Sequence, residues 1–296
     1  MATLQDIKRR IRSVRNTRKI TKAMELVAAA RLRRAEERIV QLRDYADRMQ
    51  ELTAGTARAA SSLRGLTLLQ EREPRRVAIV ALTGDRGLAG AFNGQILRRA
   101  FTLERSLRSE GKEVHWLVVG RRGRSTLRFR HYEVEQAWTG FTDRPAYHDA
   151  QAVAHRLAEL YSENEIDRAV LVYNHYVSPL VQRVTEQQVL PISQEVLGRE
   201  EEDEHERALL GDFIYEPEPE QILERLLPVY LETEVYRALL ESAASEHGAR
   251  MTAMRNASKN AAELIDSLTL DLNRARQAEI TQEILEVVAG ADALTQ

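Results

Sequence analysis

Residues 77–97, VAIVALTGDRGLAGAFNGQIL, combine three features that decide the fold of the middle of this chain. Val77 to Leu82 is a short apolar run, typical of a buried strand. A turn with glycines at positions 84, 87 and 90 follows, and a helix-like segment comes after it. This is the outline of a phosphate-cradling loop, in which glycines let backbone N–H groups approach an anion. The stretch predicts an α/β unit and raises the question of a bound nucleotide.

The glycine turn does not have the spacing of the specific nucleotide motifs. A G-x-x-x-x-G-K-[ST] motif is absent, because no lysine lies between Lys22 and Lys112, and glycines three apart do not form G-x-G-x-x-G. Asp85 would also repel a phosphate, an effect that Arg86 offsets only in part. We therefore interpret the segment as a strand-to-helix turn that needs small residues for close packing and positive φ.

The rest of the middle alternates between strand-like and helix-like segments. Strands are predicted at 76–82, 113–120, 168–177 and 181–191, and helices at 94–111 and 147–164. Strands that alternate with helices favour a mostly parallel sheet in a Rossmann-like arrangement. We expect the last strand, VQRVTEQQVLP, to lie at an edge of that sheet.

Both ends of the chain read as long helices, because all seven prolines lie between Pro74 and Pro228. Two sets of apolar or small residues follow heptad spacing, with one interruption near residues 18–25 in the first: Leu4, Ile7, Ile11, Val14, Ala28, Leu32, Ala35, Ile39, Leu42, Ala46 and Met49; and Leu240, Ala244, His247, Met251, Met254, Ser258, Ala261, Ile265, Leu268, Leu272 and Ala275. Such patterning indicates an antiparallel coiled coil of the two ends. About 50 helical residues span roughly 75 Å, which exceeds the expected diameter of the globular middle, so we expect the helix pair to project beyond it. The alternative is that the two helices fold back as a helical bundle.

These patterns predict four regions. An N-terminal shaft helix is expected at 1–60 and a Rossmann-like globular domain at 74–195. An acidic connector is expected at 196–211, followed by a C-terminal shaft helix at 212–296. The fold class is α/β plus a long antiparallel coiled coil formed by the terminal helices.

Composition excludes several kinds of chemistry. The chain of 296 residues has no cysteine, which rules out disulfides and thiolate metal sites, and its net charge of −2 predicts no general attraction to nucleic acid. Charge is uneven, however, with 14 Lys/Arg and 6 Asp/Glu in residues 1–48, and 4 Lys/Arg and 15 Asp/Glu in residues 195–241. Such asymmetry indicates distinct surfaces or partners. No signal peptide or membrane-spanning stretch is expected.

No catalytic, cofactor or metal site is predicted. The sequence has no H-E-x-x-H and no G-x-S-x-G, and the carboxylates at 200–206 read as a solvated charge run. His247 reads as a polar residue of the coiled-coil seam. The basic N-terminal helix has no aromatic residue before Tyr45, which argues against nucleic acid as its partner.

The extreme C-terminal segment, ITQEILEVVAGADAL (280–294), is apolar on most faces from Ile284 onward. One partner helix cannot cover such a surface, so it requires a surrounding apolar sleeve. Arg274, Arg276 and Gln277 precede it as polar groups at the mouth of that sleeve.

Four stretches in order along the chain resemble one known family, the bacterial form of the gamma subunit of F-type ATP synthase. They are IRSVRNTRKITKAMELVAAARLRRA (11–35), TGDRGLAGAFN (83–93), DFIYEPEPEQIL (212–223) and SEHGARMTAMRNASKNAAELIDSLTLDLNRARQAEITQEILEVVAGADAL (245–294). The resemblance covers essentially the whole chain. Ala89 stands where the family's turn often has cysteine, and the cysteine-bearing regulatory insert of the chloroplast forms is absent.

The resemblance implies a rotor without an active site or cofactor of its own. Its coiled coil would turn inside a ring of alpha and beta subunits, and its globular foot would meet the epsilon subunit and the ring of c subunits. Ion-driven rotation would force the catalytic subunits through their nucleotide states. The chain would be peripheral, at the cytoplasmic face of the cell membrane, without direct membrane span.

Residues that match the family's contact positions are carried over by similarity. Those implied to meet the ring of alpha and beta subunits are Lys22, Met24, Arg34, Arg250, Arg276 and Gln277, together with Ile284, Val287 and Val288 of the apolar tip. Those implied to meet epsilon and the c ring are Phe213, Tyr215 and Glu216. Two other hypotheses stay open on the residues alone: a Rossmann-like nucleotide-binding enzyme with coiled-coil dimerisation arms, and a coiled-coil scaffold unrelated to ATP synthesis.

Overall fold

The computed structural model describes residues 3–60, 62–63, 65–193 and 216–295. The chain forms two structural units, one of residues 1–28 with 251–296 and the other of residues 29–250. We call the first the paired-helix unit and the second the sheet unit. Helix α1 (Leu4–Ala59) and helix α6 (Pro219–Thr295) each contribute residues to both. The predicted acidic connector and two of the predicted foot residues, Phe213 and Tyr215, lie outside the described residues.

The sheet unit contains one mixed sheet among its described residues, with the strand order β3-β2-β1-β4-β5. Its parallel strands are β1 (Arg76–Leu82), β2 (Glu113–Val119), β3 (Gln136–Trp138) and β4 (Arg168–Tyr176). Strand β5 (Gln182–Leu190) pairs antiparallel with β4 at the edge. The predicted Rossmann-like arrangement, including its edge strand, is confirmed.

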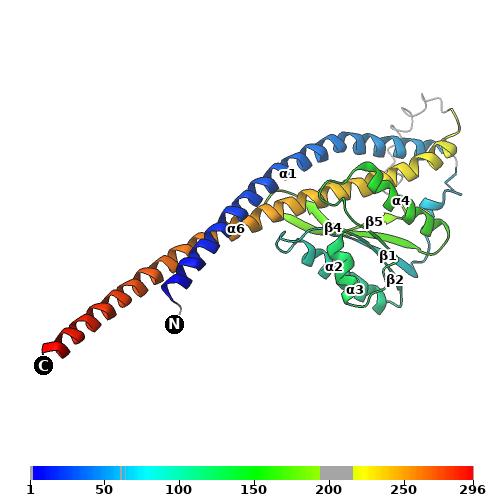
Figure 1. Ribbon diagram of the computed structural model, residues 1–296. Helices are drawn as coiled ribbons and strands as arrows, with labels where there is room; N and C mark the ends of the chain where they lie inside the picture. The colour runs from blue at the N-terminus through cyan, green and yellow to red at the C-terminus, as the bar shows by residue number, and fades with distance from the viewer. Residues whose placement is uncertain (1–2, 61, 64, 194–215, 296) are drawn as a thin grey trace. The chain divides into compact units, whose positions relative to one another are not determined.

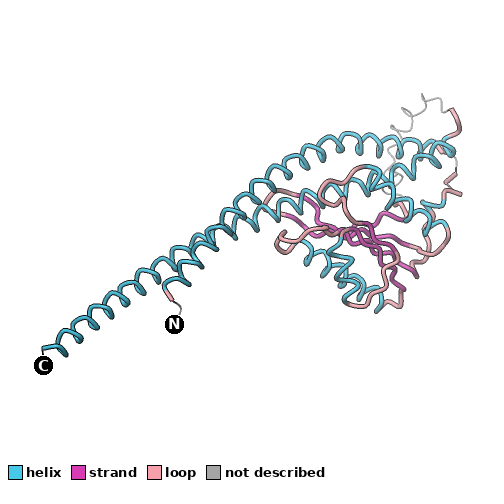
Figure 2. Tube along the Cα trace, in the orientation of Figure 1, coloured by secondary structure: helices cyan, strands magenta, loops and turns pink. Residues whose placement is uncertain are grey.

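Helices cover both faces of this sheet (Figures 1 and 2). Helices α2 (Phe92–Ser109) and α3 (Arg121–Phe129) pack on one face, and α4 (Tyr147–Ser162) and the 3-10 turn η1 (Thr67–Leu69) on the other. Strand β1 shows why both faces must be covered. Ala78, Val80 and Leu82 belong to one buried cluster, and the residues between them to the other. A strand that is apolar on both sides is typical of a parallel sheet.

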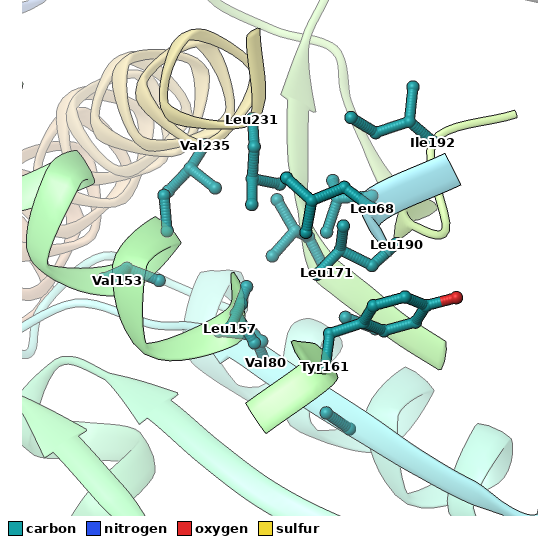
Figure 3. Packing of buried hydrophobic residues seen from close by; sticks show 14 of the residues in the cluster. Leu68, Val80, Val153, Leu157, Tyr161, Leu171, Leu190, Ile192, Leu231 and Val235 are labelled. Carbon is teal, nitrogen blue, oxygen red and sulfur yellow. The ribbon is translucent and has the colours of Figure 1, made fainter. Parts of the chain in front are cut away.

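The larger cluster joins strands, α4, η1 and α6 (Figure 3). The labelled side chains in that view are Leu68, Val80, Val153, Leu157, Tyr161, Leu171, Leu190, Ile192, Leu231 and Val235. Leu231 and Val235 come from α6, so this helix is part of the domain core. Helix α6 also runs through Pro228, which cannot donate the usual backbone hydrogen bond. Leu227 and Leu231, both buried in the same cluster, hold the helix on either side of it.

In the paired-helix unit the two helices run antiparallel. Ile11 of α1 packs with Ile265 and Leu268 of α6. Farther along α1, Arg255 of α6 donates to Glu25 at 3.1 Å. The position on α6 therefore decreases as the position on α1 increases, which is the antiparallel pairing that the heptads predict.

Candidate functional site

The turn after β1 is built around the carboxylate of Asp85. This carboxylate accepts hydrogen bonds from the backbone N–H of Arg121 at 3.0 Å, of Gly140 at 2.7 Å and of Thr142 at 3.2 Å. The hydroxyl of Thr142 also donates to it, at 3.2 Å. Arg121 is the first residue of α3, so a helix N-terminus and a neighbouring loop converge on one negative group. Asp85 thus takes the place that an anion would occupy in a nucleotide-binding turn of this type.

Close packing explains why glycines occupy several positions around this turn. Gly120 has φ of +96°, and a Cβ there would lie 2.2 Å from the backbone oxygen of Thr83. The hydroxyl of Thr83 accepts from the N–H of Gly123 at 2.9 Å and donates to the oxygen of Val119 at 2.7 Å. The N–H of Gly84 donates to the side chain of Asn93 at 2.8 Å. The packing role predicted for Gly84 is confirmed by its closeness to α6, since a Cβ there would lie 2.7 Å from Glu246 Oε2.

Helix α6 fills the place where such a sheet normally binds a ligand. In open α/β sheets ligands bind at the carboxyl ends of the strands where the strand order reverses, which in this sheet is between β1 and β4. The hydroxyl of Ser242 donates to the oxygen of Leu82 at the end of β1, at 3.3 Å. The hydroxyl of Ser245 donates to the oxygen of Asn174 in β4, at 2.9 Å. Both strands that flank the reversal are therefore bonded to α6.

Charged groups are buried beside this crossing. The guanidinium of Arg250 donates to the carboxylate of Glu246 and, at 3.3 Å, to the backbone oxygen of Gly87. Burial raises the pKa of Glu246, against the lowering effect of Arg250. Glu246 and Arg250 are both buried, so a charge-assisted bond in this place fixes α6 to the glycine turn.

His247 is a second buried titratable group on α6. Its Nε2 lies 3.0 Å from the backbone oxygen of Asp143, and burial lowers its pKa to about 4. Nε2 must carry the proton to donate to a carbonyl, so the neutral imidazole has Nδ1 free to accept. Arg250 Nη1 lies 3.5 Å from that Nδ1. The expected polar seam residue is thus a hydrogen-bonded part of the sheet unit.

A second carboxylate of α6, that of Glu232, joins this helix to α4. Glu232 accepts from the hydroxyl of Tyr147 at 2.7 Å and from the amide of Gln151 at 3.1 Å, and His155 Nε2 lies 2.8 Å away. Burial alone would raise the pKa of Glu232, but the bonds from Tyr147, His155 and Gln151 together lower it. The three donors stand on one face of α4, four residues apart. They hold Glu232 ionised against α4.

In the paired-helix unit the sequence-predicted residues are distributed along both helices. Lys22 Nζ donates to Glu25 at 3.0 Å, and Met24 is half-buried. Arg276 and Gln277 are exposed on α6. The tip residues Ile284, Val287 and Val288 are exposed by 57%, 72% and 52%. These apolar side chains therefore have little cover within the part of the chain that the structure describes.

Three further predicted residues have different surroundings. Arg34 is exposed on α1, and Glu216 is exposed ahead of α6. Arg250 is buried and makes the internal contacts described above. Of these three, only Arg34 and Glu216 are available for a contact at the surface.

Sequence reasoning missed two parts of the site. Asp85 was recognised only as a group that would repel phosphate, although a carboxylate next to a glycine turn is itself an acceptor for free N–H groups. Nothing in the sequence indicated the hydrogen bonds of Ser242 and Ser245 to the strands, because serines on a heptad-patterned helix resemble ordinary small residues of a helix–helix contact.

Two features are absent from the described residues. Within these residues no three His, Asp or Glu side chains are grouped so that they could hold a metal ion. None of the helices in the same part of the chain combines the length and apolarity needed to cross a bilayer.

Comparison with known proteins gives a consistent result over the full length. The family model described as ATP synthase matches residues 3–294. The ATP synthase gamma chain of Rubrobacter xylanophilus is 47% identical over 99% of both chains, and that of Moorella thermoacetica is 46% identical over 99% of this chain and 100% of its own.

Solved structures agree in fold. A chain from the central stalk and c-ring of the Tetrahymena thermophila mitochondrial ATP synthase has a TM-score of 0.59 at 26% identity, covering 81% of this chain and 99% of that one. A chain from the Euglena gracilis mitochondrial ATP synthase has a TM-score of 0.68 at 19% identity, covering 98% of this chain and 94% of that one. This chain belongs to the ATP synthase gamma chain family.

Proposed function

We propose that this chain is the non-catalytic rotor of the central stalk of an F-type ATP synthase. It couples ion-driven rotation of the c ring to the conformational cycle of the catalytic subunits. The observation that carries the proposal is the full-length identity of 47% to a gamma chain. The crossing of α6 over the strand-order reversal supports it against a nucleotide-binding enzyme, because the usual ligand position is taken by the chain's own helix.

The exposed apolar end of α6 supports a contact with a surrounding ring of alpha and beta subunits. Ile284, Val287 and Val288 would lie inside that ring. Hydrophobic contact is non-directional, so such a tip can change its angle within a sleeve at little cost. Arg276 and Gln277, just before the tip, would make directional contacts with ring subunits that form and break during rotation.

The basic part of α1 supports a contact with acidic segments of the catalytic subunits. Residues 7–24 contain eight Lys/Arg and no Asp/Glu. Lys22 and Met24 lie in this stretch, and Arg34 lies about three turns farther along. Each exposed ion pair contributes about 1 kcal/mol or less, so we expect torque to be distributed over many such contacts. Arg250, committed to Glu246, would act by holding α6 rather than by touching the ring.

The foot contact with epsilon and the c ring is proposed for Phe213, Tyr215 and Glu216. Glu216 is exposed, as a partner contact requires. An assembly of this kind would place the chain at the cytoplasmic face of the membrane as a peripheral component. The chain would reach the membrane only through its partners.

Co-assembly with purified alpha and beta subunits tests the proposal. We expect one copy of this chain per ring and ATP hydrolysis by the assembly, whereas the chain alone does not hydrolyse ATP. ATP turnover by the chain alone, or failure to co-assemble, would overturn it. A truncation after Ile284 should weaken assembly more than it reduces rotation, since the sleeve contact is mainly positional. The matched control is Leu270→Ala, an exposed apolar residue before the tip, which should assemble normally.

A further inference from the structure

The sheet unit has a cleft whose lining includes Arg34, which is also proposed above as a contact of the catalytic subunits. It has a volume of about 570 Å³ and lies between α1, the loop at 143–145 and α6. Arg31, Arg34 and Arg38 line it from α1, and Arg144 lines it from the loop. The α1 arginines are three and four residues apart, so they occupy one face of the helix. The cleft is therefore a cluster of guanidinium groups from two elements.

Both acidic side chains of the cleft have an arginine partner. Asp143 accepts from Arg31 at 2.7 Å, and Glu37 pairs at 3.3 Å with Arg33, which does not line the cleft. Among the described residues, Arg34 and Arg144 have no carboxylate partner, and Arg38 has only the backbone oxygen of Pro145, at 3.4 Å. Three positive charges thus face the cleft without compensation.

The floor of the cleft is apolar. Ala35, Leu240 and Ala243 line it and are buried, with exposed fractions of 8%, 1% and 3%. A low-dielectric wall strengthens the attraction between the guanidinium groups and an anion. Arginine also presents paired N–H donors in a planar fork that match the oxygens of a phosphate group.

We propose that this cleft binds an oligophosphate group, either as inorganic triphosphate or as the phosphate chain of a nucleotide. Arg34, Arg38 and Arg144 each contact phosphate oxygens. The volume lies within the range of small-molecule sites, about 300–1,000 Å³, and the apolar floor accommodates a base where the ligand has one. The bound ligand bridges α1 and the loop at 143–145. The site is separate from the strand-order reversal that Ser242 and Ser245 cover, and it does not depend on the rotor function.

Isothermal titration of the purified full chain with inorganic triphosphate and with ATP tests the site. We expect saturable binding of one triphosphate per chain, which weakens as salt is raised. Arg34→Ala and Arg144→Ala should each weaken it about tenfold or more. Both side chains are exposed, so these variants are expected to fold, which circular dichroism checks. The matched control is Arg48→Ala on the same helix, an exposed arginine outside the cleft, which should bind like the parent.

The ligands distinguish the source of the phosphate. Equal affinity for triphosphate and ATP supports an inorganic ligand, and tighter binding of ATP supports a nucleotide whose base uses the apolar floor. Three results would overturn the proposal: no saturable binding of either ligand, binding of adenosine as tight as that of ATP, or the same loss in Arg48→Ala as in Arg34→Ala. The last would mean that the helix attracts anions only through its general charge.

Discussion

Replacement of Asp85 by alanine tests whether this carboxylate organises the turn after β1. The side chain is only 10% exposed and accepts from three backbone N–H groups and one hydroxyl. A hydrogen bond to a charged group contributes about 1.5–3 kcal/mol. Four such bonds in one network do not add, and Arg121 is an exposed residue, so we expect water to replace part of the carboxylate's contacts there. We expect a loss of about 3 kcal/mol in the free energy of unfolding.

Thermal unfolding followed by circular dichroism measures this loss. For a domain of 150–250 residues, 1 kcal/mol corresponds to about 2–4 °C, so the Tm of Asp85→Ala should fall by about 6–12 °C. The matched control is Glu73→Ala, which removes a carboxylate that is 77% exposed and paired only with Arg75. It should change the Tm by less than about 2 °C, as expected for a surface ion pair.

Added phosphate or sulfate gives a second readout. Removing the Asp85 side chain leaves three N–H donors directed at an empty position, which is the arrangement of an anion site. Sulfate should therefore raise the Tm of Asp85→Ala more than that of the parent or of Glu73→Ala. The reasoning is refuted if Asp85→Ala unfolds within 1 °C of the parent. Equal stabilisation of all three proteins by sulfate would refute the claim that the donors form an anion site.

Three other perturbations have outcomes set by the geometry. Gly120→Ala should lower the Tm by several degrees, because the backbone φ of Gly120 is +96° and an added Cβ would clash with Thr83. Gly94→Ala is the control: an added Cβ at Gly94 would have no atom within 4 Å, so the Tm should stay unchanged or rise. Equal effects of the two substitutions would contradict this reasoning. Glu25→Gln should cost about 1 kcal/mol at pH 7 in urea unfolding. The hydrogen bond from Lys22 lowers the native pKa of Glu25, so the ionised carboxylate stabilises the fold fully above its unfolded pKa, and the cost should disappear as pH falls through the native pKa. A cost that persists at low pH would contradict this reasoning. His247→Gln should flatten the fall in stability between pH 6.5 and 4, since its native pKa is about 4 and only the unfolded chain takes up the proton in that range; an unchanged pH profile would exclude His247 as its source.

The strongly patterned elements of the fold could be predicted from sequence. Strands β1, β2, β4 and β5 lie within one residue of the predicted ranges, because each is an apolar or alternating run bounded by polar or turn residues. Helix α3 and strand β3 were missed. Helix α3 has nine residues, of which only Gly123 and Leu127 are buried, and β3 has three. Elements this short carry too few periods for their pattern to be distinguished from a loop.

The heptad spacing of the C-terminal helix was predicted correctly, but the sequence did not show that its residues 238–248 pack within the sheet unit. Leu240, Ala244 and His247 follow the same spacing as Ile265 and the residues after it. Residues 238–248 are nevertheless buried on nearly every face within the sheet unit, whereas the later positions form a one-sided seam with α1. A heptad pattern identifies the apolar face of a helix and does not identify what covers the opposite one. The small residues at 242–245, SAAS, allow that second cover.

The way α6 crosses the sheet relates the fold to the proposed role. A Rossmann-like sheet leaves an opening at its strand-order reversal, and enzymes of this fold use the opening for a ligand that must enter and leave. This chain closes it with a helix held by Ser242, Ser245 and the buried pair Glu246–Arg250. A ligand site must release its ligand, whereas a helix that is anchored to the sheet must stay in place. Hydrogen bonds to two strands, a buried ion pair and a clamp at Glu232 fix one stretch of α6 against rotation about its own axis. Such fixing is what a helix needs if torque is to pass through it, and a vacant nucleotide site in the same position would remove it.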